Sequence, residues 1–180
     1  MRTFVLAMAA VAAIGLPPGA SAEDSPATRR SLRGLPGVGL YVHPLGADAE
    51  ALGLSADRLE RLLRARLDAA DIPVLDADEQ QRTPGRPGLS LHVAALRLEN
   101  GELLYSVHLD LKQWVALLGG MSAALETPLT APATTWSPDY RMGISPSEDA
   151  LADIMAATRE MTDQFIGAYW RANPLKRPIP

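Results

Sequence analysis

No cysteine occurs in the 180-residue chain. The chain therefore forms no disulfide and no thiolate metal site, and it contains no thiol nucleophile. A cysteine to carry the lipid of a lipoprotein is missing as well. Stability has to come from packing alone, and the length is sufficient for one domain with a single core.

An excess of positive charge is also missing. The chain has 17 Lys and Arg against 21 Asp and Glu, a formal net charge of −4. Binding to nucleic acid requires a basic stripe that meets the phosphates, so we expect no nucleic-acid partner. The sequence contains no Gly-x-Ser-x-Gly, His-Glu-x-x-His, Gly-x-Gly-x-x-Gly or Walker pattern. We therefore expect no cofactor.

One long apolar run lies at the amino terminus. Arg2 precedes the apolar residues 4–16, Pro-Pro-Gly at 17–19 and Ala-Ser-Ala at 20–22, which has the small-x-small form of a signal-peptidase site. These features predict a signal peptide over residues 1–22, cleavage near Ala22, and a mature protein in the periplasm or outside the cell. An uncleaved membrane anchor is the alternative. No second run is long enough for a membrane span.

The rest of the chain is expected to form a single α/β domain over residues 38–172. The polar residues 23–37, which end in Pro-Gly, are expected to be a flexible leader. Asn173-Pro174 stops the last helix, and residues 173–180 are expected to be a flexible tail.

The domain is organised around an expected β-hairpin. Residues 88–98 and the first part of 103–118 alternate apolar and polar residues, and Asn100-Gly101 between them is a strong hairpin signal. The period of two puts one set of side chains on each face of an antiparallel sheet. The apolar set is Leu89, Leu91, Val93, Tyr105, Val107, Leu109 and Leu111. The opposite set is Ser90, His92, Ala94, Ser106, His108, Asp110 and Lys112.

Two helices are expected to cover the apolar face. The first begins at Ser55 as N-cap and covers residues 56–70, with leucines at helical spacing. The second covers residues 146–170. Ser-Pro-Ser-Glu at 145–148 fits a capping box with Ser at the N-cap and Pro at N1. Phe165 lies in the apolar stripe of this second helix.

Shorter elements complete the expected fold. Strands are expected at 38–43, 72–75 and around 133–136, loops at 46–54 and 76–87, and a turn at 137–140. Within residues 113–136 the pattern leaves strand, helix and loop open. The order β-α-β-β-β-β-α predicts an α+β two-layer sandwich. Its mostly antiparallel sheet of four or five strands would carry two helices on one face and leave the other face open.

The order of these elements resembles small α/β modules of bacterial envelope accessory proteins. Gly53-Leu54-Ser55, the amphipathic helix, residues 69–74, the long hairpin and the closing helix are similar to the amino-terminal domain of TolB-type proteins and to penicillin-binding-protein activator lipoproteins. The resemblance covers residues 38–169. It implies a non-catalytic scaffold or partner-binding module and assigns no residue a role.

Histidine is the first candidate for chemistry. His43, His92 and His108 are the three histidines of the chain, each on the polar side of an expected strand. With Asp110 they would meet on the open face if their strands are neighbours. Neutral imidazole is the commonest zinc or copper ligand, so this set is a candidate metal site or hydrolase site. The competing interpretation is three ordinary exposed residues at unrelated heights, because strand order and register are open.

Aromatic side chains are scarce, at 5% of the chain. Trp114, Trp136 and Trp170 are expected to pack in the core or at its rim, with an aromatic platform for a ligand as the alternative. We favour a non-catalytic binding or scaffold domain of the bacterial envelope, with a protein partner or self-association. The residues expected to form its surface are Tyr41, His43, His92, His108, Asp110 and Trp114. The alternative is a metal-binding protein or small hydrolase that uses the three histidines and Asp110.

Overall fold

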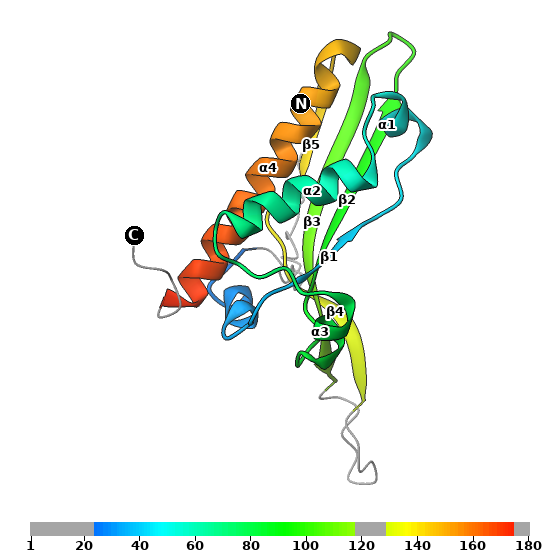
Figure 1. Cartoon of the computed structure of the whole chain (residues 1–180). Coiled ribbons are helices and arrows are strands. Elements are labelled where there is room, and N and C mark those ends of the chain that lie inside the picture. Colours follow the sequence, from blue (N-terminus) through cyan, green and yellow to red (C-terminus); the bar gives the residue numbers. More distant parts are fainter. Residues whose placement is uncertain (1–23, 118–128, 175–180) are drawn as a thin grey trace, which may run out of the picture.

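The computed structural model describes residues 24–117 and 129–174, and within them a mixed five-stranded sheet carries helices (Figure 1). The strands are β1 (Gly39–Val42), β2 (Gly88–Arg97), β3 (Leu103–Ala116), β4 (Thr130–Trp136) and β5 (Arg141–Ser145). The helices are the 3-10 helix η1 (Thr28–Leu32) and the α-helices α1 (Ala47–Ala51), α2 (Ala56–Asp68), α3 (Ala77–Arg82) and α4 (Ser147–Ala172). This architecture confirms the predicted α+β class. None of the helices in these two ranges is long and apolar enough to cross a membrane.

The predicted hairpin is confirmed and forms the middle of the sheet. Strands β2 and β3 pair antiparallel from Gly88↔Lys112 to Arg97↔Leu103, and β1 pairs with β2 in parallel. On its other side β3 pairs antiparallel with β5 along its first half and with β4 along its second half. A register shift lies within the pairing of β3 with β4, where Leu111 pairs with Trp136 and Lys112 with Thr134. Such an irregularity bends and twists the strands locally.

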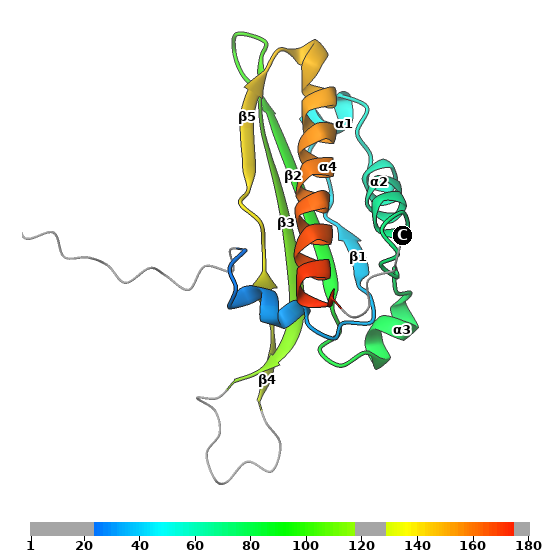
Figure 2. The ribbon, with the colours of Figure 1, turned by 90° about the vertical axis from the view of Figure 1, so that its left-hand side faces the viewer.

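The two faces of the hairpin differ as its alternation predicts. Leu89, Leu91 and Leu109 are fully buried on one face, whereas His92 and Lys112 are exposed on the other. Helix α4 lies along most of the length of the hairpin, with α2 beside it (Figure 2). Side chains of α2, α4 and the hairpin belong to one buried cluster. The helices therefore cover the leucine face, as expected.

Helices α2 and α4 supply the other half of this core. In α2 the Ser55 side chain accepts a hydrogen bond from the Arg58 N–H, which confirms the predicted N-cap. The buried leucines of α2 are Leu59, Leu63 and Leu67. In α4, Phe165 is fully buried and meets the ring of Trp136 edge-on, with 5.4 Å between the ring centroids. Burial of a side chain such as Phe165 stabilises the fold by about 1.5–3 kcal/mol.

The start of α4 differs from the prediction. Ser145 ends β5 instead of capping the helix, and its hydroxyl donates a hydrogen bond to the Asp153 carboxylate. Pro146 occupies the N-cap position and makes no side-chain capping bond. The predicted capping box at 145–148 is therefore wrong. Pairing with β3 keeps Ser145 in the sheet, so a tertiary contact overrides the local helix-start signal.

Four short elements also differ from the expectation. Residues 72–75 form no strand in the described structure, where Val74 makes one isolated parallel bridge to Val38. The loops expected at 46–54 and 76–87 contain α1 and α3. Helix α3 begins with a capping box in which Asp76 and Glu79 bond reciprocally to each other's backbone N–H. Strand β5 was not expected, because its five residues have no independent signal and depend on pairing with β3.

The segment before β1 is packed against the core. Leu32 and Leu35 are buried, and Tyr169 of α4 donates a hydrogen bond to the Leu35 carbonyl at 2.8 Å. Asn173, directly after α4, accepts from the Gly34 N–H at 2.7 Å and donates to the Leu32 carbonyl at 2.9 Å. These contacts correct the expected boundaries at residues 38 and 172, since the packed domain includes part of the expected leader and tail. The predicted signal peptide and residues 175–180 lie outside the described residues.

Candidate functional site

The side of the sheet opposite α2 and α4, here called the open face, carries the residues that the sequence nominated. Parallel pairing places Tyr41 of β1 beside Ser90 of β2, and antiparallel pairing places His92 opposite His108 of β3. Tyr41 is 67% exposed and Trp114 is 45% exposed, which is unusual for such large side chains. The neighbouring strands therefore bring the predicted residues onto one surface.

The three histidines form a row, in which His43 directly follows β1, His92 lies on β2 and His108 lies on β3. The ring centroids of His43 and His92 are 5.5 Å apart, and His92 is the cross-strand partner of His108. Each outer imidazole already has a polar partner. His43 Nε2 lies 2.8 Å from Ser90 Oγ, and His108 Nε2 lies 2.8 Å from Asp110 Oδ1. Over residues 24–117 and 129–174, no three His, Asp or Glu side chains are arranged to hold a metal ion.

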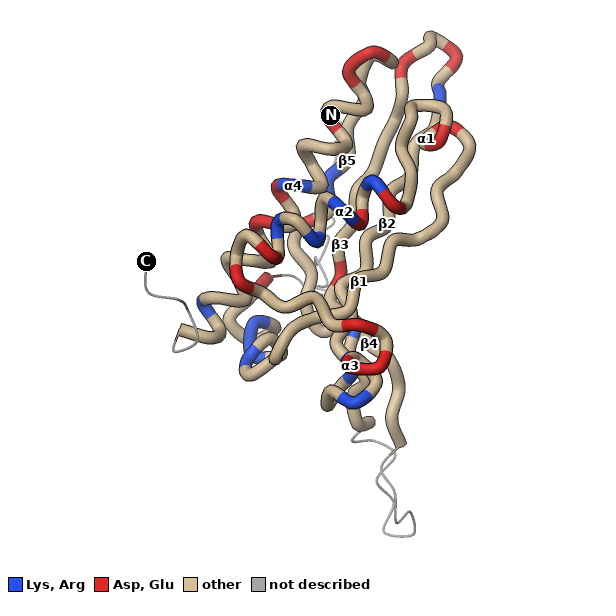
Figure 3. Tube along the Cα trace, in the orientation of Figure 1, with Lys and Arg blue, Asp and Glu red and all other residues tan. Residues whose placement is uncertain are grey.

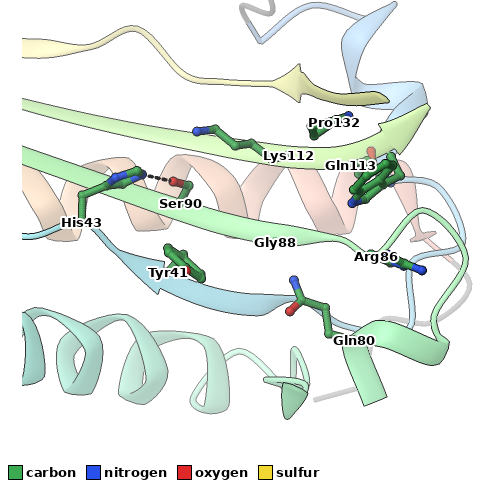
Figure 4. Close-up of a pocket in the computed structure, with 10 residues that line it drawn as sticks. Tyr41, His43, Gln80, Arg86, Gly88, Ser90, Lys112, Gln113 and Pro132 are labelled. Carbon is green, nitrogen blue, oxygen red and sulfur yellow. Dashed lines mark hydrogen bonds between the residues drawn. The ribbon is translucent and has the colours of Figure 1, made fainter. Parts of the chain in front are cut away.

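A pocket of about 240 Å³ lies at the α3 end of this face (Figure 4). Figure 4 views the sheet with α4 behind it and shows Tyr41, His43 and Lys112 in front. Tyr41, His43 and Trp114 were nominated from the sequence. The further lining residues are Gln80, Arg86, Gly88, Ser90, Lys112, Gln113 and Pro132. The sequence prediction missed Gln80 and Arg86 because residues 76–87 were interpreted as a surface loop. It assigned Ser90 and Lys112 to the open side of the hairpin without including them in a site.

Two paired glycines make room for one wall of the pocket. Gly39 of β1 lies beside Gly88 of β2, and the side-chain amide of Gln80 packs over both. A Cβ atom on Gly39 would lie 2.6 Å from Gln80 Cδ, and one on Gly88 would lie 2.9 Å from Gln80 Nε2. Gln80 Nε2 also donates a hydrogen bond to the Pro87 carbonyl at 3.1 Å. Glycine at both positions therefore leaves room for the Gln80 side chain of α3 over the strand ends.

Arg86 is held in an uncommon backbone conformation at the rim of the pocket. Its φ is +44°, directly after Gly85 at +75°, and a side chain is strained in this left-handed region. The turn is tied to its neighbours by hydrogen bonds from Arg86 N–H to the Thr83 carbonyl and from Trp114 N–H to the Gly85 carbonyl. The Arg86 guanidinium carbon lies 5.4 Å from the centroid of the Trp114 ring, within the range of a cation–π contact.

The other two tryptophans pack as expected. Trp136 is fully buried, and its indole N–H donates to Asp24 Oδ1 at 2.9 Å. Trp170 is half-buried and donates to the Ala70 carbonyl at 3.1 Å. Trp114 differs from both because its ring faces the pocket. The alternation of the sequence is lost after Gln113, so this difference was not evident from the sequence.

The opposite end of the open face is apolar and exposed. Leu96, Met142 and Ile144 are 57%, 61% and 59% exposed, respectively. Leu96 lies on β2, and Met142 and Ile144 lie on β5, on the two sides of β3, where Leu104 pairs with both Leu96 and Ile144. Large apolar side chains gathered on one surface are typical of an interaction site. The sequence prediction missed this patch because β5 was not recognised as a strand.

Charge is distributed unevenly along the molecule (Figure 3). Acidic residues gather around α1, the hairpin turn and the start of α4. They are Asp48, Glu50, Glu99, Glu102, Glu148 and Asp149. Arginines gather at η1, at the other end of the long axis. Negative charge is therefore concentrated at the end of the molecule that holds the hairpin turn.

Comparisons with known proteins add little to this description. No family model and no curated protein matches the chain. Among solved structures, the 2.35 Å crystal structure of a minor lipoprotein from Acinetobacter baumannii is similar at 14% sequence identity and a TM-score of 0.27. The match covers 76% of this chain and 94% of the lipoprotein chain. A likeness this remote carries no argument about function, so the functional proposal depends on the sequence and the site.

Proposed function

We propose that the protein is an exported binding or scaffold domain of the bacterial cell envelope that holds a partner protein on the open face of its sheet. One observation carries the proposal: the face left uncovered by α2 and α4 presents exposed Tyr41, Leu96, Met142 and Ile144. Exposed aromatic and Met side chains are enriched at protein interfaces. The predicted signal peptide supports export, and the resemblance to envelope modules supports the location.

Site-specific photo-crosslinking in the cell that exports the protein tests this proposal. A photoreactive residue at Tyr41 or Met142 samples the open face, and one at the exposed Arg61 of α2 is the control for the opposite side. We expect one discrete crosslinked protein from Tyr41 and Met142 and none from Arg61. An equal yield from all three positions, or no product from the open face, would contradict the proposal.

Export is tested separately by fractionation of the same cells. We expect the protein in the periplasm or the medium, with a mature chain that begins at Glu23. A chain that keeps residues 1–22 and sediments with the membrane would support the uncleaved-anchor alternative instead.

The alternative considered above is a metal-binding protein or small hydrolase that uses the row of histidines with Asp110, although no three His, Asp or Glu side chains of the described residues are arranged to hold an ion. Three imidazoles on adjacent strands supply the ligand type that zinc and copper prefer. The test compares the wild-type protein with a variant in which His43, His92 and His108 are all alanine. Metal content equal in both, with melting unaffected by a chelator, would remove this candidate. Metal lost only from the variant would favour it.

A further inference from the structure

We infer that the pocket between α3 and the sheet is the anchor point for the partner, and that it binds a carboxylate next to an apolar side chain of the partner's peptide chain. The inference deepens the proposed function and rests on it, because it names what the partner presents at the open face. Size, charge, wall chemistry and backbone geometry of the pocket each support it.

The size of the pocket fits a single residue. Its volume of about 240 Å³ lies below the roughly 300–1,000 Å³ typical of small-molecule sites. The pocket opens on the surface of a sheet, so a peptide can place one side chain inside and continue along the face. A peptide residue is therefore a better match than a whole cofactor or drug-sized ligand.

The charge of the pocket is positive. Arg86 and Lys112 line it, and no Asp or Glu is among its lining residues. Asp110, two residues before Lys112 on the same face of β3, lies 2.8 Å from His108 Nε2, and Asp78 and Glu79 lie on α3. None of these three acids lines the pocket. The acidic residues around the hairpin turn lie at the other end of the open face (Figure 3). An approaching carboxylate is therefore repelled from the turn and attracted to Arg86 and Lys112.

The rings of two aromatic residues and a proline form apolar walls of the pocket. Tyr41 and Trp114 stand at two sides, and Pro132 of β4 adds a third apolar surface. Aromatic rings pack favourably against other rings and alkyl groups. The contact between Arg86 and the Trp114 ring keeps a cation at the edge of this apolar space. A ligand with an apolar body and a negative group can pack against the apolar walls and contact the Arg86 cation at the same time.

The backbone supports a role for Arg86 in particular. Residues in the left-handed region persist only where the surroundings hold them, and they are concentrated at binding sites. Here the hydrogen bond from Trp114 N–H to the Gly85 carbonyl fixes the turn onto β3. The strained turn and the ring contact thus place the guanidinium at the pocket rim before any ligand arrives, which lowers the ordering cost of binding.

Two small probes test the chemistry of the pocket. Indole-3-acetate carries a carboxylate on an apolar ring, and indole-3-acetamide is its neutral isostere. Binding to the mature protein is followed by NMR at the Trp114 indole N–H. We expect the acetate to bind and the amide to bind more weakly. Arg86→Gln and Lys112→Gln should each raise the Kd of the acetate about three- to tenfold. Arg82→Gln is the matched control, because Arg82 is an exposed arginine of α3 that pairs with Asp78 outside the pocket.

Equal affinity for the two probes, or an equal loss in the Arg82→Gln variant, would overturn the inference. A second arm links the pocket to the partner. Indole-3-acetate, but not the amide, should suppress the crosslink formed from Tyr41. If the acetate binds but leaves this crosslink unchanged, the pocket takes a small carboxylate and the assignment to a partner peptide is wrong. If crosslinks form at the open face while neither probe binds, the proposed function stands and the carboxylate pocket fails.

Discussion

Neighbouring residues of one strand have opposite environments on the two faces of this sheet. Leu91 of β2 is fully buried beneath the helices, and His92, the next residue, is exposed on the open face beside the ring of His43. Both are paired with β3, Leu91 opposite Leu109 and His92 opposite His108, and their side chains lie on opposite faces of the sheet. Stability is therefore expected to depend on the covered face and binding on the open face.

The largest expected effect tests the covered face by placing a charge in it. Phe165→Asp should unfold the domain. A buried Phe→Ala change alone lowers the free energy of unfolding by about 3–5 kcal/mol, and Asp adds the cost of burying a carboxylate. Circular dichroism and thermal melting measure the result. The matched control is Tyr41→Asp, the same kind of change at a side chain that is 67% exposed, which should remain folded. A cooperative wild-type melt for Phe165→Asp would contradict the core assignment.

Adjacent residues of β2 give the sharpest comparison of the two faces. Leu91→Ala should lower the free energy of unfolding by about 2–5 kcal/mol, because it leaves a cavity beneath the helices. His92→Ala, one residue further along, should change it by no more than about 0.5 kcal/mol. Urea denaturation of the two variants measures both values. A similar loss in the free energy of unfolding for both variants would mean that stability does not depend mainly on the covered face.

The stability that Asp24 contributes is expected to depend on pH. Its carboxylate contacts Arg29 of η1, Trp136 of β4 and Arg171 of α4. Burial alone would raise the pKa of the Asp24 carboxyl, but hydrogen bonds from Arg29 and Trp136 and the charges of Arg29 and Arg171 lower it below its ordinary value of 3.8. A carboxyl with a lowered pKa adds stability above the ordinary value and loses it as the pH falls through the folded value. Asp24→Asn should lower the Tm at neutral pH by about 4 °C.

The difference between Asp24→Asn and the wild-type protein should shrink as the pH falls below 3.8. Melting curves over the acid range measure it, with Asp57→Asn on α2 as a control carboxylate. A constant difference at every pH would show that the Asp24 contacts act through hydrogen bonding and not through charge.

The smallest expected effect on stability occurs at the open face. Arg86→Gly relieves a left-handed strain of roughly 1–2 kcal/mol. It also removes a cation–π contact and adds freedom to the unfolded chain, each worth about 0.5–1 kcal/mol. The free energy of unfolding should therefore stay within about 1 kcal/mol, while indole-3-acetate binds more weakly. Denaturation and NMR titration of the same sample measure the two quantities. Unchanged binding would remove Arg86 from the site.

The sequence alone predicted the long elements and strands β1 and β4, and it missed α1, α3 and β5. The alternation around Asn100-Gly101 identified the hairpin and its two faces, and the spacing of leucines after Ser55 identified α2. Each of these signals is local and extends over many residues, so the predicted element is also present in the folded protein. Strand β5 and the first residue of α4 were missed or misplaced because pairing with β3, distant in the chain, decides the conformation of Ser145.

Among the candidate site residues, too, local patterns predicted some, whereas others depend on contacts between distant parts of the chain. The period of two placed Tyr41 and His92 on the polar side before any strand order was known, whereas the pattern around Trp114 left strand, helix and loop open. Lys112 was assigned to that side as well but was not recognised as part of a site. Arg86 and Gln80 were assigned to a surface loop, because their positions depend on how α3 folds back over a glycine pair. No local pattern encodes that contact.

The sequence by itself determined which side chains share a face, because alternation along a strand and spacing along a helix are properties of the local backbone. The tertiary structure decided which faces meet and where a pocket forms. Strand order, register and the closure of α3 over Gly39 and Gly88 depend on contacts between residues far apart in the chain. Only in the folded protein do Arg86 and Lys112 lie beside Tyr41 and Trp114.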